Sequence, residues 1–476
     1  MARQKMEFTN CLKALSGALL ALNLAATSVL AVQDNPLPVE PTVAAASEEA
    51  AQQLTNFRLP KGWQASLWAA EPMVANPVAF AIDDRGRLYL CESFRQEQGV
   101  TDNRSHDERW VDRDLAARTV ADRIAYHEEL LPNRGADYRR QDDRVRLLVD
   151  LDRDGRADRA EVFANRFHAL EDGTLAGVLP IGDEVWLTNI PHLWRLKDAD
   201  GDGRAEVRES LQSGFGVRVA FRGHDMHGLI RGPDGRIYFS IGDRGYHLQT
   251  ADGRLLADPE SGAVFRCEPD GSRLEVVATG LRNPQELAFD AFGNLFTGDN
   301  NSDSGDRARW VHVLPGADSG WRMAYQYLPD RGPFNREKIW EPLNAEQPAY
   351  VFPPVANVAD GPSGLLYYPG TGVGRDLEQS FLLCDFRGTP AMSGIRRVRL
   401  EPAGAFFKLN SAEEMVWQIL ATDCAIGPDG WLYASDWVNG WVGENKGRIY
   451  RFGDHGVIDQ SAVREVAARL EQGFTG

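Results

Sequence analysis

The sequence is poor in cysteine and in basic charge, and each shortage excludes a class of function. Only 5 of its 476 residues are cysteine, and none lies in a Cys-x-x-Cys-His motif, so this chain encodes no covalently attached haem. Its 52 lysines and arginines are outnumbered by 69 aspartates and glutamates, which gives a net charge of −17. Because phosphate backbones and anionic lipids attract clustered basic residues, the chain is no general nucleic-acid binder and is unsuited to acidic membranes. A hydrophobic fraction of 43% and a charged fraction of 25% indicate a globular protein, which excludes a disordered chain or a multi-span membrane protein.

The first 31 residues predict a secretory signal peptide. A basic start precedes an apolar run from Ala14 to Val32, and Val29 and Ala31 are small enough for the two positions that signal peptidase reads. We therefore expect cleavage near Ala31, export to the periplasm or cell surface, and no transmembrane span afterwards. An uncleaved anchor helix is the alternative. Residues 32–55 are rich in Pro, Ala, Val and Glu and predict a linker.

Four cysteines follow the signal peptide, far apart and in or near apolar strand patterns. They are Cys91, Cys267, Cys384 and Cys424. Both disulfides and buried free thiols are compatible with this spacing.

One strand–turn–strand pattern recurs six times. Each copy is an apolar strand, a glycine turn and a second apolar strand, and the clear copies end in an acidic residue. The copies lie at residues 80–92, 177–187, 229–243, 287–299, 364–385 and 424–436. A glycine turn between alternating apolar residues signals a hairpin, and a repeated unit too small to bury its own faces is typical of a propeller blade. The sequence therefore predicts an all-β, six-bladed β-propeller over residues 56–455, with an irregular β-sandwich array as the alternative.

Two helical segments interrupt or follow this repeat. Residues 107–131 predict a helical insertion in the first blade. Within residues 456–476, the stretch Ser461–Gln472 predicts a C-terminal helix, with Val463, Val466, Ala467 and Leu470 on one face. This helix either begins a helical-repeat region or docks beneath the propeller.

Two twelve-residue acidic loops match the calcium-loop pattern. Their candidate ligands are Asp150, Asp152, Asp154, Asp158 and Glu161 in the first loop, and Asp198, Asp200, Asp202, Glu206 and Glu209 in the second. Carboxylates at positions 1, 3 and 5 can converge on a hard cation when glycine at position 6 permits a sharp turn. Apolar strand patterns flank the loops, so we expect calcium-binding hairpin turns with a structural role. Ordinary turns without an ion are the alternative.

A histidine-containing strand carries the clearest chemical signal. His224 stands at the start of a predicted inner strand, and Asp243 ends the next strand of the same blade. A histidine oriented by a carboxylate is a suitable general base, although such a pair, taken alone, is more often structural.

This stretch resembles the soluble quinoprotein glucose/sorbosone dehydrogenase family. The resemblance rests on the strand from His224 to Asp243, on Arg282-Asn-Pro-Gln285, and on the turn Gly316–Trp321. It implies that His224 removes a substrate hydroxyl proton and that Asp243 orients it. It also implies that Arg282, Asn283 and Gln285 belong to a segment that contacts pyrroloquinoline quinone (PQQ), and that calcium binds at Asp299 and Asn300.

More of the chain is similar to a narrower group, the exported propellers named as membrane-bound dehydrogenases. The stretches Asp102–His106, Pro191–Trp194 and Gly214–Val217 carry this similarity. Members are often followed by helical repeats and a c-type cytochrome, which implies a cytochrome as electron acceptor.

The sequence departs from the quinoprotein family at two basic positions. Phe386 stands where that family places a lysine, with Arg387 as the candidate substitute, and the stretch Leu420–Asp423 lacks the family's basic pair. PQQ carries several carboxylates, and burying them unpaired is costly.

We therefore expect a periplasmic PQQ-dependent dehydrogenase that oxidises a sugar or related alcohol. One alternative is a calcium-dependent lactonase-type hydrolase, with an axial metal held by residues among Glu92, Asp243, Asp299, Asn300 and Asp436. The other is a non-catalytic carbohydrate- or partner-binding propeller that uses Trp431, Trp437 and Trp441.

Overall fold

The computed structural model describes residues 38–303, 305–322 and 351–472, together with the single positions 337, 344 and 346. The chain divides into two compact units, Met1–Asn35 and Pro36–Gly476, and every described residue lies in the second. The predicted signal peptide 1–31 and the start of the predicted linker 32–55 therefore lie outside the described residues.

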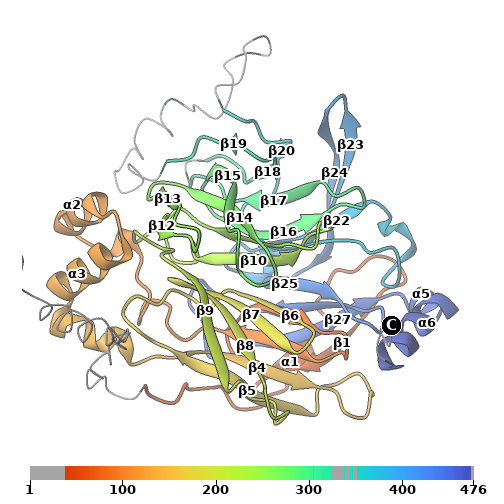
Figure 1. Cartoon of the computed structure of the whole chain (residues 1–476). Helices are drawn as coiled ribbons and strands as arrows, with labels where there is room; N and C mark the ends of the chain where they lie inside the picture. Colours follow the sequence, from red (N-terminus) through yellow and green to blue (C-terminus); the bar gives the residue numbers. More distant parts are fainter. Residues whose placement is uncertain are drawn as a thin grey trace, which may run out of the picture. The chain divides into compact units, whose positions relative to one another are not determined.

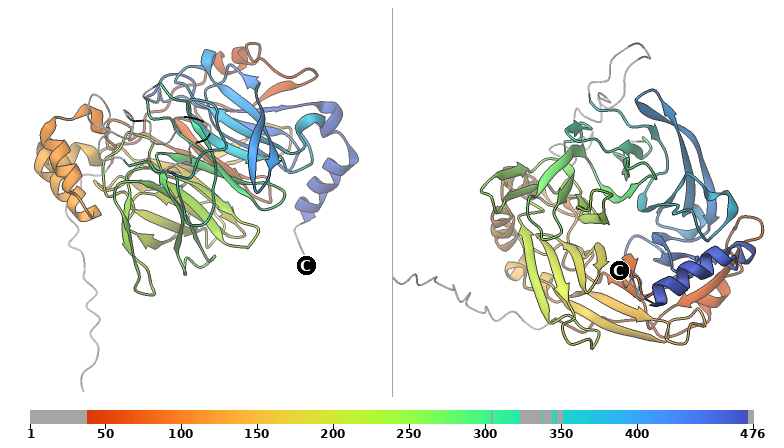
Figure 2. Two further views of the ribbon diagram at one scale, coloured as in Figure 1. Left: turned by 90° about the horizontal axis from the view of Figure 1, so that it is seen from above. Right: turned by 45° about the vertical axis from the view of Figure 1, so that its right-hand side comes forward.

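Six antiparallel sheets form the blades of a ring, which confirms the predicted six-bladed β-propeller (Figures 1 and 2). Each repeated unit supplies the inner and second strands of one blade. The inner strands are β2 (Pro77–Ile82), β6 (Gly177–Ile181), β10 (Met226–Arg231), β16 (Pro284–Phe289), β21 (Pro362–Tyr367) and β25 (Ala421–Ile426). The second strands are β3 (Leu88–Glu92), β7 (Glu184–Asn189), β11 (Ile237–Ile241), β17 (Leu295–Asp299), β22 (Ser380–Asp385) and β26 (Leu432–Asp436).

Two further strands complete each blade. The third strands are β4 (Asp143–Val149), β8 (His192–Lys197), β14 (Gly262–Cys267), β18 (Arg309–His312), β23 (Gly394–Ala403) and β27 (Arg448–Gly453). The outer strands are β5 (Arg159–Phe167), β9 (Val207–Ser213), β15 (Glu275–Leu281), β20 (Ala356–Asn357), β24 (Phe406–Trp417) and β1 (Gln64–Ala69). In blade 3, β19 (Ala317–Asp318) pairs with β15, and β12 (Tyr246–Gln249) and β13 (Leu255–Asp258) form a separate hairpin.

Glycine makes the tight turn between inner and second strands possible. In the four clear copies of the repeat, the turn glycine has a φ of +79° to +85°, a region that residues with a Cβ rarely adopt. These glycines are Gly86, Gly235, Gly293 and Gly430.

The ring closes through the first strand of the chain. β1 pairs antiparallel with β27, so Gln64 lies opposite Gly453 and an N-terminal strand completes the sixth blade. In the described part of the chain, one apolar cluster fills each of the six interfaces between neighbouring blades. Because each blade buries both of its faces against neighbours, the repeat is stable only as a closed ring.

Helices lie at the periphery of the ring. The predicted insertion is confirmed: α2 (Glu108–Ala116) and α3 (Val120–Leu130) stand between β3 and β4 and pack through Trp110 and Tyr126 onto residues 217–219 (Figure 1). Short elements are α1 (Glu49–Gln53), α5 (His455–Ile458), and the 3-10 turns η1 (Asn103–Ser105), η2 (Pro132–Arg139), η4 (Arg375–Leu377) and η5 (Pro390–Met392).

The C-terminal helix α6 (Ser461–Gln472) has the predicted bounds. Its expected apolar face is only partly used, because Val463 is buried near Gly430 of blade 6 whereas Val466 is exposed. In the part of the chain that the structure describes, no helix has the length and apolar character needed to cross a bilayer. The four cysteines that follow the predicted signal peptide are buried free thiols and form no disulfides with one another.

Candidate functional site

A cavity of about 490 Å³ lies at the end of the ring where the inner strands begin. All six blades contribute to its wall, through residues at or just before the inner strands. Among them are Val78, Thr174, His227, Gln285, Ser363 and Thr422. Loops between the blades add charged and aromatic side chains around the same space.

His224 lines this cavity and is held by a buried carboxylate. Its Nδ1 lies 2.7 Å from Oδ1 of Asp243, and both side chains are almost fully buried. The indole Nε1 of Trp321 donates to the other oxygen of Asp243, also at 2.7 Å. Because the carboxylate accepts, Nδ1 carries the proton, and Nε2 is the ring nitrogen that a ligand can use.

The backbone allows this close approach only with glycine beside the histidine. A Cβ at Gly242 would lie 2.8 Å from both the Cβ and the carbonyl oxygen of His224, which is closer than packed atoms tolerate. The second histidine of the strand, His227, is used differently. Its ring nitrogens lie 3.2 Å from the Ala176 carbonyl and 3.0 Å from the Gly223 carbonyl, and burial lowers its pKa. Both ring nitrogens of His227 are thus occupied by backbone carbonyls, so this side chain joins two backbone segments of the wall.

Acidic residues end the second strands of blades 1, 4, 5 and 6, and Asp243 stands two residues beyond the second strand of blade 3. We call them end-strand acids. Glu92 accepts from Arg144 Nε at 2.6 Å and from the Ala75 amide at 2.7 Å. In blade 5, Asp385 accepts from Arg396 Nε at 2.7 Å. Each acid thus ties the second strand to an arginine of the third strand.

One further end-strand acid follows this pattern: Asp299 accepts from Arg309 and from the amides of the strand-initiating segment. Asp436 lies opposite Arg448 in the register of blade 6 but accepts from the amides of Leu420 and Val438, while Arg448 pairs with Glu49 and Glu71. Burial raises the pKa of Asp436 to about 6. Glu92, Asp299 and Asp436 lie inside the blades and are absent from the described wall of the cavity. The axial ligand set expected for a lactonase is therefore not assembled.

Blade 3 departs from this pattern at Asp243. Ile241 lies opposite Ala263 in the register, so Ser261 and Gly262 stand where other blades place their arginine. The end-strand acid of blade 3 is bound instead by a histidine that opens onto the cavity and by Trp321. The repeat thus provides an internal reference: in blades 1, 4 and 5 the end-strand acid pairs with an arginine, whereas in blade 3 it binds an imidazole.

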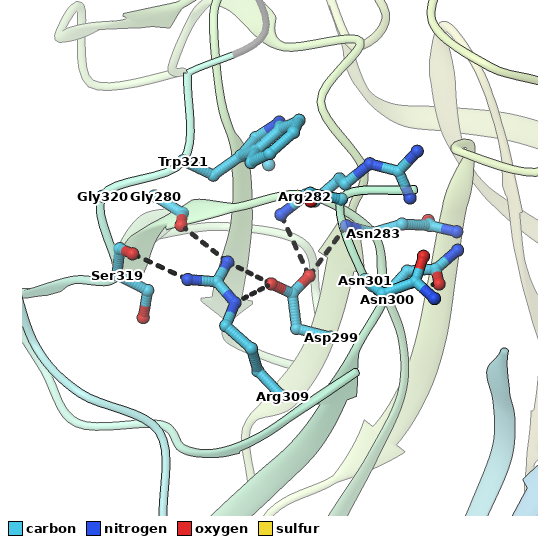
Figure 3. Close-up of polar contacts among 12 residues, drawn as sticks. Gly280, Arg282, Asn283, Asp299, Asn300, Asn301, Arg309, Ser319, Gly320 and Trp321 are labelled. Atoms are coloured by element: carbon cyan, nitrogen blue, oxygen red, sulfur yellow. Dashed lines mark hydrogen bonds and ion pairs between the residues drawn. The ribbon is translucent and has the colours of Figure 1, made fainter. Parts of the chain in front are cut away.

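The predicted calcium position at Asp299 and Asn300 is not assembled as expected. Both oxygens of Asp299 are used, one by the amides of Arg282 (2.9 Å) and Asn283 (2.8 Å) and the other by Arg309 Nε (3.0 Å) and Nη2. Figure 3 shows the Asp299 carboxylate turned toward Arg309, while Asn300 lies on the other side of the strand end. Asn300 lines the cavity, but Asp299 does not. The Asp299 carboxylate is thus already paired with a buried arginine.

The expected cofactor-binding residues do meet at the cavity. Arg282, Asn283, Gln285 and Arg387 all line it. Arg282 pairs with Asp303 at 2.8 Å, and Arg387 pairs with Asp385 at 2.8 Å and Asp360 at 2.9 Å. Oδ1 of Asn283 is buried and has no hydrogen-bond partner among the described residues.

Sequence reasoning missed most of the wall, including one phenylalanine and two arginines. Arg104 from the first-blade insertion, and Phe221 and Arg222 from the connection between β9 and β10, lie beside His224. The stretch Asp102–His106 stood out in the sequence, but no local pattern indicates that an insertion reaches the axis of the ring.

The two acidic turns join strands, as expected, and share one hydrogen-bond pattern. Asp150 accepts from the Gly155 amide and Asp198 from the Gly203 amide, each at 2.9 Å. Possible ligand atoms gather within 4.8 Å of one another in two groups, Asp150, Asp152 and Asp158 in the first turn, and Asp198, Asp200, Asp202 and Glu206 in the second.

Three expected calcium ligands lie outside these groups. They are Asp154, Glu161 and Glu209. The chain enters the extended strands β5 and β9 after position 9, so position 12 cannot return to the ion as it does from a helix. Glu209 pairs with Arg195 at 2.6 Å instead, and Glu161 lies 3.6 Å from Arg159.

Solved structures with a similar fold include two proteins described as glucose dehydrogenase. One is 17% identical with a TM-score of 0.51, over 82% of this chain and 98% of that one, and the other is 16% identical with a TM-score of 0.50, over 82% and 99%. The PQQ-bound aldose sugar dehydrogenase of Streptomyces coelicolor is 15% identical with a TM-score of 0.43, over 83% and 100%. No curated protein matches. The family model described as "Domain of unknown function (DUF7133)" matches residues 49–455.

Proposed function

Since the chain belongs to the DUF7133 family, whose description names no activity, we propose its function from the site: a quinoprotein dehydrogenase that oxidises a sugar or related alcohol. The observation that carries the proposal is in blade 3, where the end-strand acid Asp243 binds and orients His224, whereas Glu92, Asp299 and Asp385 bind arginines. The fold shared with proteins described as glucose dehydrogenases supports it.

The residues of the wall divide the work of such a reaction. His224 accepts the substrate hydroxyl proton at Nε2, because Asp243 holds Nδ1 as the donor and stabilises the imidazolium that forms. Trp321 keeps the carboxylate in place through its indole N–H. Burial of the pair limits the water that reaches it, which strengthens the interaction between the two groups.

The cavity fits PQQ. About 490 Å³ suits a small molecule, and the unpartnered Oδ1 of Asn283 and the guanidinium groups of Arg282 and Arg387 offer polar contacts. When bound, PQQ would supply the two-electron acceptor that the chain itself lacks. We do not expect Asp299 to hold calcium, because Arg309 already neutralises its carboxylate.

The aromatic residues support a sugar-sized ligand. Trp431 is buried and absent from the cavity wall, Trp437 is buried and lines the cavity, and Trp441 is 59% exposed and lines it beside Phe386. An exposed tryptophan at a cavity mouth is suited to stacking on a sugar ring. A binding propeller without catalysis would use the same residue, so turnover separates the two functions. The predicted signal peptide supports export, and a c-type cytochrome is the proposed electron acceptor.

The direct test combines purified protein, PQQ and calcium with a panel of aldoses and an artificial electron acceptor. We expect a change in the PQQ spectrum on binding and reduction of the acceptor with at least one sugar. His224→Asn should keep the spectral change and lose turnover, since it removes the base and leaves the arginines in place. Absence of both signals from the wild type would reject the proposal, and sugar binding without turnover would favour the non-catalytic alternative.

We also propose that the two acidic turns bind calcium and fasten neighbouring blades. The Ala157 amide donates to Trp68 O of β1 at 2.8 Å, and the Ala205 amide donates to Phe163 O of β5 at 2.9 Å. Each turn thus holds the outer strand of the preceding blade, and the first turn does so at the ring closure. An ion bound only by the folded turns would stabilise both contacts.

Chelation is therefore expected to lower the melting temperature, and calcium should restore it. The double variant Asp198→Asn/Asp200→Asn should lose part of this response, because it removes two carboxylates of the second group. Asp183→Asn is the control, since Asp183 is an exposed acid of the same blade that pairs with Lys197. A melting temperature that chelator leaves unchanged would make the turns ordinary hairpins.

A further inference from the structure

Two arginines reach the cavity from outside the repeated strands. Arg104 lies in η1 of the first-blade insertion, and Arg222 lies in the connection that leads to β10. We propose that Arg104, assisted by Arg222, binds a carboxylate of the ligand and so supplies positive charge that the Phe386 position and the Leu420–Asp423 stretch lack. The inference rests on the proposed function for the identity of the ligand.

Arg104 is oriented by a buried brace. Its Nε and Nη2 donate to the two oxygens of Asp102 at 2.9 and 2.6 Å, and the Asp102 side chain is only 4% exposed. Burial raises the pKa of Asp102, but the hydrogen bonds from Arg104 outweigh it and leave the pKa lowered. The brace therefore stays charged, and the planar guanidinium is fixed before any ligand arrives.

The opposite edge of the guanidinium is free to bind. The Arg104 side chain is 49% exposed, and Nη1 has no hydrogen-bond partner among the described residues. Its face lies on the Phe221 ring, with Cζ 3.8 Å from the ring centroid. A braced and stacked arginine with one open edge loses little conformational entropy on binding an anion.

Phe221 connects this arginine to the proposed base. The rings of Phe221 and His224 are 5.7 Å apart between centroids, and Arg282 Cζ lies 5.1 Å from the same phenyl ring. Arg104, Arg282 and His224 thus all contact one phenylalanine. A ligand group on Arg104 therefore belongs to a molecule that also reaches His224.

Arg222 can add a second donor. Its amide donates to Asp102 at 3.3 Å, which joins it to the same brace, and its side chain pairs with Glu97 at the rim. The Glu97 side chain is 49% exposed. The Arg222 side chain is only 19% exposed, but its partner carboxylate is open to water, so a ligand carboxylate can take the place of Glu97.

The carboxylate has two chemical sources, the cofactor PQQ and a sugar acid such as glucuronate. Separate titrations with PQQ, glucuronate and neutral glucose, followed by tryptophan fluorescence, distinguish them. Arg104→Gln should weaken binding of the carboxylate-bearing ligand about tenfold or more and leave glucose binding unchanged. If Arg104→Gln binds PQQ more weakly than the wild type does, Arg104 contacts the cofactor. If it binds glucuronate more weakly, Arg104 contacts the substrate.

Arg208→Gln is the matched control. Arg208 also stacks on a phenylalanine, with Cζ 3.9 Å from the Phe167 centroid, but it lies in β9 and is absent from the cavity wall. Equal affinities of Arg104→Gln and Arg208→Gln for both anionic ligands would overturn the inference and leave the proposed function intact. Failure of the wild type to bind PQQ would count against the proposed function, and the glucuronate titration would still decide the role of Arg104.

Discussion

Replacing Asp243 by asparagine is expected to lower the kcat/KM of sugar oxidation by about 10²–10⁴-fold while the protein stays folded. Trp321 donates to one carboxylate oxygen, so the amide oxygen of an asparagine would face the indole and its NH₂ would face His224. The NH₂ can only donate, so Nδ1 would become the acceptor and the proton would move to Nε2. An imidazole protonated at Nε2 cannot take the substrate proton.

The role of Trp321 in this argument can be tested in the same background. Trp321→Phe removes the N–H that fixes the amide, so the double variant Asp243→Asn/Trp321→Phe should recover part of the activity that Asp243→Asn loses. Steady-state kinetics with a saturating artificial acceptor measures both variants, and PQQ titration shows that the cavity still binds. Near-wild-type turnover of Asp243→Asn would mean that His224 is not the base. A double variant no better than the single one would remove Trp321 from the mechanism.

The architecture could be predicted from the sequence because residues close together in the chain determine it. The glycine turns and alternating strands of the repeat specify each hairpin locally, and the helix Ser461–Gln472 follows from its own periodicity. His224 and Asp243 could be paired because they flank adjacent strands of one blade, just before β10 and just after β11. Interactions within one blade are therefore accessible to sequence reasoning.

The sequence did not allow us to predict interactions between blades or the side chains that bind each end-strand acid. The sequence places an acid at the end of a second strand, but it does not state whether an arginine or a histidine binds it. Asp299 was expected to bind calcium and proves to be occupied by Arg309, which lies ten positions later on the third strand. Arg104 was missed because the insertion reaches the cavity only through tertiary contacts, such as the Asn103 amide bonding to the Ala220 carbonyl.

This difference between Asp243 and Asp299 predicts that the same substitution, aspartate to asparagine, affects stability differently at the two positions. Replacing Asp299 by asparagine is expected to cost about 3–5 kcal/mol of unfolding free energy, because it leaves a buried guanidinium without its counter-charge. The Arg309 side chain is only 6% exposed, and its remaining partners are the carbonyls of Ser319 (2.8 Å) and Gly280 (3.3 Å), as Figure 3 shows. Asp243→Asn should cost much less stability, since an asparagine can still accept from the Trp321 indole and donate to the His224 ring.

Denaturant unfolding of both variants, with Asp290→Asn as the control, measures this contrast. Asp290 lies in the same blade and accepts the amides of Phe292 and Asn294, which an asparagine side chain can also bind. A large loss confined to Asp299→Asn would mean that the repeated acid stabilises the blade and that blade 3 gave up this stability to orient a base. If Asp299→Asn is as stable as Asp290→Asn, Arg309 does not depend on that carboxylate. Asp299 would then be free to turn toward Asn300, and calcium binding by these two residues would again be the preferred interpretation.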